Sequence, residues 1–150
     1  MKKRFIIYLA VVAGIYVFAI LIAGGRLIMF WDFPTLLLTP FVPLILMLGH
    51  YSPSEIIDAF RIAGHCERSD VDIKKSLLFF KTIHKLIMLS GFFAVILGIV
   101  MILTAYPSEN FSKHIGNYMA VCILSGAYAL FFVMIICIPF ESALEKKLIR

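Results

Sequence analysis

A few side chains are of types that could support catalysis or metal binding. His65, Cys66 and Glu67 are adjacent and carry metal-ligating groups, but no second ligand pair lies at a spacing typical of a zinc site. Ser125 has no histidine or acidic residue in its own apolar segment, so the sequence does not support nucleophilic catalysis. We therefore expect no catalytic, metal-binding or cofactor-binding residues, and we expect that the chain is not an enzyme.

Four long apolar segments surround these residues. Hydrophobic residues make up 62% of the 150-residue chain and charged residues 15%, which leaves more apolar surface than a soluble globule of this size can bury. A membrane-spanning helix needs about 20 mainly apolar residues. The sequence therefore predicts an all-α integral membrane protein, a single domain over residues 1–150, with four transmembrane helices. Their expected bounds are 5–23, 33–49, 86–106 and 115–140, and none contains Asp, Glu, Lys or Arg.

Glycines and prolines mark the ends of the first two expected spans. Gly24 and Gly25 are too few for a phosphate-binding loop and are typical of a helix stop. Pro34 is compatible with the first turn of the second span. Pro40 and Pro43 lie within that span and remove backbone donors, so we expect neighbouring helices to satisfy the freed carbonyl groups.

The basic residues orient the four spans. Three precede the first span, six lie in residues 51–85 and three follow the last span, whereas the other side holds only Arg26 and Lys113. Cytoplasmic loops of membrane proteins carry the excess of lysine and arginine. We therefore predict a multi-pass membrane protein with both termini and the 51–85 loop in the cytoplasm.

The 51–85 loop carries two helix-start signals. Ser52 and Glu55 fit a capping box with proline at the first helical position, and Gly64 is placed to end that helix. Ser69 and Asp72 form a second start signal. The loop is therefore predicted to be a short amphipathic helix, a turn, and a helix that runs unbroken into the third span.

Small residues form a stripe on each of the last two spans. Small side chains allow helix backbones to approach closely in membranes. They are compatible with packing inside one subunit, or with a face that lines a pore or holds a partner helix. The stripes comprise Gly91, Ala94, Gly98 and Ala105 in the third span, and Cys122, Ser125, Gly126 and Ala129 in the fourth.

Ordered segments of the chain resemble a known family. These segments are GGRLIMFWDFPTLLL (24–38), AFRIA (59–63), GIVMIL (98–103) and IGNYMAVCILSGAYALFFVMIICIPFESALEKK (115–147). Together they resemble the MotA branch, the flagellar stator branch, of the MotA/TolQ/ExbB proton-channel family. With only 35 residues in the 51–85 loop, the chain would be a compact member that lacks the large cytoplasmic domain.

The resemblance implies an assembly. It implies a pentameric ring in the bacterial inner membrane, whose third and fourth helices line a pore. It also implies a single-span partner of the MotB/ExbD/TolR type that supplies an intramembrane aspartate. Val95, Ser125 and Gly126 fall where the family carries pore threonines. The expected pore or partner-helix face comprises Val95, Gly98, Cys122, Ser125, Gly126 and Ala129, and the family-matching structural positions are Gly24, Gly25, Asp32, Pro34 and Pro139.

Two functions follow from the sequence and the resemblance. The first is a subunit of an oligomeric ion-channel or stator-like complex that couples ion flow to the movement of its single-span partner. The alternative is a non-conducting structural or assembly subunit of such a complex. Because the spans contain no acidic or basic residue, the chain alone offers no group to carry a proton at mid-membrane.

Overall fold

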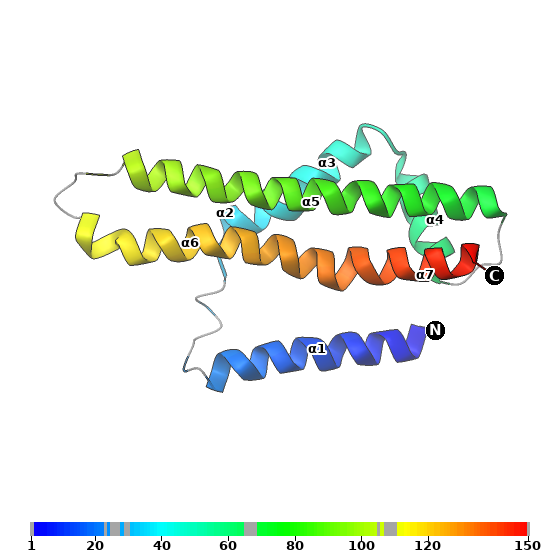
Figure 1. Cartoon of the computed structure of the whole chain (residues 1–150), viewed down its shortest axis with the longest axis horizontal. Helices are drawn as coiled ribbons and strands as arrows, with labels where there is room; N and C mark the ends of the chain where they lie inside the picture. Colours follow the sequence, from blue (N-terminus) through cyan, green and yellow to red (C-terminus); the bar gives the residue numbers. More distant parts are fainter. Residues whose placement is uncertain are drawn as a thin grey trace.

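A computed structural model describes residues 2–22, 24, 28, 31–64, 69–104, 106 and 111–149, and these residues form helices joined by short turns (Figure 1). The chain follows the order α1, α2, η2, α3, α4, α5, α6, η3, α7, where η2 and η3 are single π-helical turns. The helices before α5 are α1 (Lys2–Ile22), α2 (Phe33–Leu36), η2 (Leu37–Phe41), α3 (Val42–Leu48) and α4 (Pro53–Gly64). The rest are α5 (Asp70–Thr104), α6 (Phe111–Phe132), η3 (Val133–Cys137) and α7 (Ile138–Leu148).

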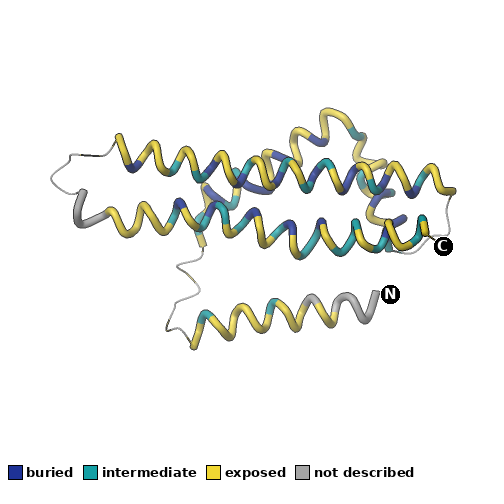
Figure 2. Tube along the Cα trace, viewed as in Figure 1, coloured by how far each residue is buried: buried dark blue, intermediate teal, exposed yellow. Residues whose placement is uncertain are grey.

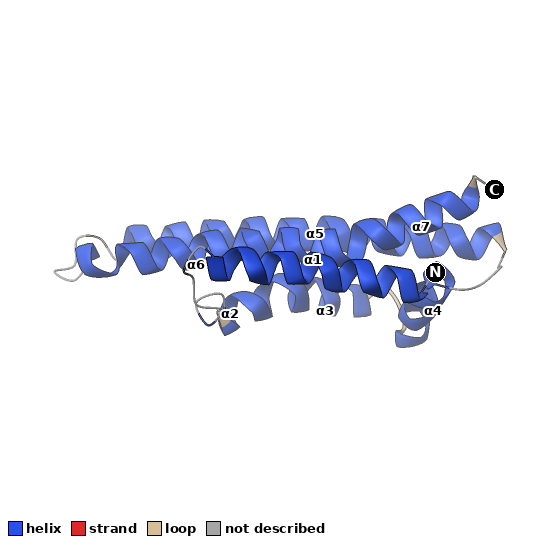
Figure 3. Ribbon diagram, turned by 90° about the horizontal axis from the view of Figure 1, so that it is seen from below, coloured by secondary structure: helices blue, strands red, loops and turns tan. Residues whose placement is uncertain are grey.

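The centre of the fold is a long antiparallel hairpin. Helix α5 runs beside the continuous helical run of α6, η3 and α7, and α2 and α3 lie on one side of this pair (Figures 1 and 3). The close approach depends on small residues: a Cβ atom added at Gly91 would overlap that of Ala129, and one added at Gly98 would lie 3.1 Å from Cys122. Figure 3 shows no described helix on the other side of the hairpin.

Prolines explain the two π-helical turns. Pro40 lies inside η2 and cannot donate to the carbonyl group four residues earlier, so the helix widens locally. In the same widened turn, the carbonyl group of Leu38 accepts a hydrogen bond of 2.9 Å from the Ser90 hydroxyl group on α5. Pro139 follows η3 in the same way, in the first turn of α7. The carbonyl groups four residues before Pro40 and Pro43 are those of Leu36 and Thr39, so Ser90 supports η2 at a different carbonyl group.

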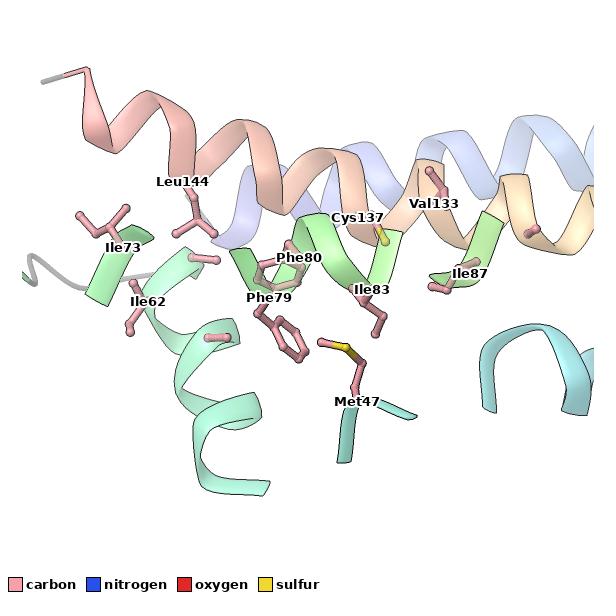
Figure 4. Packing of buried hydrophobic residues seen from close by; sticks show 13 residues of the cluster. Met47, Ile62, Ile73, Phe79, Phe80, Ile83, Ile87, Val133, Cys137 and Leu144 are labelled. Atoms are coloured by element: carbon pink, nitrogen blue, oxygen red, sulfur yellow. The ribbon is translucent and has the colours of Figure 1, made fainter. Parts of the chain in front are cut away.

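An aromatic core joins the helices at the end of the bundle that contains α4 and α7, here named the α4 end (Figure 4). The rings of Phe79 and Phe80 on α5 are fully buried. Phe80 stacks on Phe140 of α7 with ring centroids 5.1 Å apart, and Phe60 of α4 meets both Phe80 and Phe140 edge-on. Leu144 is buried in the same core. This core holds α4 against α5 and α7.

Much of the surface away from the α4 end is apolar and exposed (Figure 2). Two helical runs in the described part are long and apolar enough to cross a membrane, namely α5 and residues Ile115–Leu148. A third candidate exists if the pair Phe33–Leu48 and Pro53–Gly64, bent by 111°, is counted as one span, and the apolar stretch Ala10–Ile22 of α1 is shorter. The prediction of an all-α fold is confirmed for the described residues. Of the four predicted spans, the described helices supply two candidates, or three if the bent pair is counted as one span.

The local signals in the sequence locate several helix ends. Helix α4 begins at Pro53 and ends at Gly64, and α5 begins at Asp70 and continues without a break to Thr104, as predicted. The last helical run continues through Pro139 to Leu148, beyond residue 140, at which the expected fourth span ends. The widened turn of η3 accommodates the proline, so Pro139 does not end the helix.

Candidate functional site: the interface between α5 and α6

The residues expected to form a pore or partner-helix face lie together between α5 and α6 of the same chain. Gly98 meets Cys122, and a Cβ atom at Gly126 would lie 3.5 Å from a methyl group of Val95. Ala129 is buried against Gly91, a residue of the third-span stripe. The two small faces therefore pack on each other, which is the arrangement that packing inside one subunit predicts.

The polar atoms of this interface are engaged within the chain. Ser125 is only 4% exposed, and its hydroxyl group donates a 3.1 Å hydrogen bond to the carbonyl group of Val121 in its own helix. The Sγ atom of Cys122 donates to the carbonyl group of Val95 across the interface at 3.2 Å. Val95 adds no polar side-chain atom. In this arrangement the Ser125 hydroxyl group does not face an open pathway.

A second polar group lies where α2 and η2 approach α5 and α6, and sequence reasoning missed it. Thr35 and Thr39 are buried one helical turn apart, and Ser90 faces them from α5 through its bond to Leu38. The Thr39 hydroxyl group has no hydrogen-bond partner among the described residues. The two threonines one helical turn apart in an apolar segment were the available signal, because a hydroxyl group in such a segment calls for a hydrogen-bond partner.

The family-matching positions have structural roles where they are described. Gly24 follows the end of α1 with a positive φ of 73°, a conformation that favours glycine, so the predicted helix stop is confirmed there. Asp32 caps α2 by accepting from the backbone N–H group of Thr35 at 3.2 Å, and its own N–H group donates to the Tyr128 hydroxyl group on α6. Pro34 lies in the first turn of α2. Gly25 lies outside the described residues.

Charged contacts link α5 to α7 at the α4 end. Lys81 and Glu145 form an ion pair of 2.8 Å, and this hydrogen bond raises the pKa of Lys81. Nδ1 of His84 lies 3.0 Å from a carboxylate oxygen of Glu141, in a more buried setting. The Lys147 ammonium group donates to the carbonyl group of Ile62 near the end of α4. These contacts join residues far apart in sequence, so periodicity could not reveal them.

A groove lies between α4 and α5. It has a volume of about 370 Å³ and is open along one side. Glu55 and Asp58 of α4 and Asp72 and Lys75 of α5 lie along it, and we name it the α4–α5 groove. Ser52 donates to Glu55 through its backbone and its hydroxyl group, and these bonds lower the pKa of Glu55.

No group of three or more metal-ligating side chains gathers in the part of the chain that the structure describes. The adjacent residues His65, Cys66 and Glu67 lie outside that part. Comparison with protein-family models, with curated proteins and with solved structures found no match to this chain.

Proposed function

We propose that the chain is a subunit of an oligomeric inner-membrane complex of the ion-channel or stator type, which couples ion flow to movement of a single-span partner. The carrying observation is the long hairpin of α5 with α6, η3 and α7. It is apolar over residues 86–106 and 115–140, without acidic or basic residues, and large side chains such as Phe92, Met101 and Ile123 are exposed on it. Exposed apolar surface of this extent needs lipid or other helices to cover it.

The proposed topology combines this hairpin with the two earlier apolar segments. It has four transmembrane helices, and both termini lie in the cytoplasm, as the distribution of basic residues predicts. Helix α4 is bent by 111° from the α2–α3 run. In the proposed topology it lies on the cytoplasmic side and is not part of a span. The aromatic core and the charged contacts of the α4 end support this assignment, because charged side chains are costly inside lipid.

The absence of carboxylate groups from the apolar segments is the reason to propose a partner protein. An ion that crosses the bilayer needs polar or charged groups along its path. The four apolar segments contain no carboxylate, so the ion-carrying group must come from another chain. The family resemblance supports a single-span partner of the MotB/ExbD/TolR type with an intramembrane aspartate, and a ring of five copies of this chain around it.

The second candidate function is a non-conducting structural or assembly subunit of such a complex. One specific observation favours it: the Ser125 hydroxyl group is buried and bonded to its own helix, and Val95 is apolar. The small faces also have their partners inside one chain. In this alternative, contacts between copies are made by the exposed side of the hairpin, and no ion passes.

Native mass spectrometry in a mild detergent tests the proposed assembly. We expect a homo-oligomer, five copies by the resemblance, and with it a co-purifying protein that has a single apolar span. An oligomer without such a protein favours the structural alternative. A monomer at all protein concentrations would contradict both candidates.

A further inference from the structure

Helix α1 has little packing against its own chain. Most of its described side chains, including Ile7, Tyr8 and Phe18, are exposed. The ring of Tyr16 contacts that of Phe131 on α6 at a centroid distance of 6.4 Å. Figure 1 shows α1 beside the bundle and connected to it through residues 23–32. A helix held in this way is free to pack on a neighbouring molecule.

The beginning of α1 is basic and lies at the α4 end. Lys2, Lys3 and Arg4 give this end of the helix three positive charges at neutral pH. Figures 1 and 3, which share the long axis, both place the start of α1 level with α4. The start of α1 is therefore level with the α4–α5 groove, and Figure 1 shows this helix start apart from α4 within the same chain.

The α4–α5 groove has the complementary charge. Its three carboxylates, Glu55, Asp58 and Asp72, outnumber the single ammonium group of Lys75, which gives a difference of two negative charges with His50 neutral. Asp58 forms an ion pair with Arg61 of the same helix, and its length of 3.9 Å is beyond hydrogen-bond distance. The carboxylate of Asp58 therefore retains the capacity to bind another cation.

The floor of the groove suits a long basic side chain. Ile62 and Phe79 line the groove and are nearly fully buried. Lysine and arginine place their methylene groups along apolar surface while the charged end reaches polar groups. The combination of an apolar floor and an acidic rim therefore fits basic side chains better than it fits simple ions.

We infer that the α4–α5 groove binds the basic N-terminal run, Lys2 to Arg4, of a second copy of this chain. The inference rests on the proposed oligomer and names one contact that would hold it together. In a closed ring each copy offers one groove and one basic helix start, so the same contact repeats around the ring. The contact also adds a neighbour at the start of α1, a helix whose described side chains are mostly exposed.

Disulfide cross-linking between two differently tagged copies tests the contact. Both copies carry Cys66→Ser and keep the buried Cys122 and Cys137. One copy carries Lys2→Cys, and the other carries Leu78→Cys, a lining position that is 60% exposed.

The matched control is Ile57→Cys, which is 57% exposed on α4 and does not line the groove. We expect the Leu78→Cys pair to cross-link on the order of tenfold faster than the control pair, because binding raises the local concentration.

Charge exchange then identifies the occupant. Asp58→Lys in the groove copy should slow cross-linking about threefold, and Lys3→Glu in the other copy should restore it, because the pair keeps opposite charges. Equal rates at Leu78 and Ile57 in an intact oligomer would overturn the inference and leave the proposed assembly standing. Rates that follow the content of anionic lipid and ignore the charge exchange would assign the basic run to lipid headgroups, and would also overturn it. A protein that remains monomeric would remove the proposed assembly as well.

Discussion

At the residue scale, the small residues of α5 and α6 set the distance between the two helices. Gly91→Ala places a methyl group in the space occupied by Ala129, whereas Gly116→Ala in α6 meets no atom within 4 Å. We expect Gly91→Ala to lower the free energy of unfolding by about 1–3 kcal/mol, the usual cost of overpacking. Thermal unfolding in detergent should show a lower Tm for Gly91→Ala only. Equal melting of both variants would mean that α5 and α6 do not approach this closely.

Ser90 provides a second prediction at this scale. Ser90→Ala removes the donor to the Leu38 carbonyl group, whereas Thr82→Ala removes a hydroxyl group that donates to the carbonyl group of Leu78 in its own helix. An unsatisfied buried carbonyl group costs about 1–3 kcal/mol, so Ser90→Ala should destabilise the protein and Thr82→Ala should change it little. Denaturant titration of both variants measures this. A neutral Ser90→Ala would mean that η2 has another donor for that carbonyl group.

At the element scale, α4 depends on its capping box. Glu55 accepts hydrogen bonds from Ser52, and its pKa is lowered from the usual 4.5. A carboxyl group whose pKa is lower in the folded state stabilises the fold above its unfolded pKa, and this contribution is lost as the pH falls through the folded value. The stability difference between the native chain and Glu55→Gln should therefore be present at pH 7 and vanish below the folded pKa. A difference that is constant across this range would exclude the ionised cap.

The elements also show which part of the structure can be predicted from the sequence. Local signals located the starts of α4 and α5 and the end of α1, because capping residues and a left-handed glycine act within one turn. The small stripes on α5 and α6 were recognised, but periodicity could not say whether Gly91 and Ala129 face each other or another subunit. The aromatic core depends on Phe60, Phe80 and Phe140, which come together only in the folded chain.

At the scale of the whole molecule, the orientation in the membrane is open to direct test. The basic residues predict that the 107–114 loop faces outward and that Cys66 faces the cytoplasm. Ser108→Cys in a Cys66→Ser background should react with an impermeant thiol reagent added to intact cells, and Cys66 in the native chain should react only after the cells are opened. The opposite order of labelling would invert the proposed topology.

The central claim is that the chain belongs to an ion-coupled complex in which a partner supplies the ion-carrying group. Flux of protons and sodium ions in liposomes tests it most directly, with the chain alone and with its co-purified single-span protein. Because the spans contain no acidic or basic residue, we predict that the chain alone leaves both gradients intact. Flux should appear with the aspartate-bearing partner and disappear when that aspartate is replaced by asparagine. Gradient loss with the chain alone would contradict the claim.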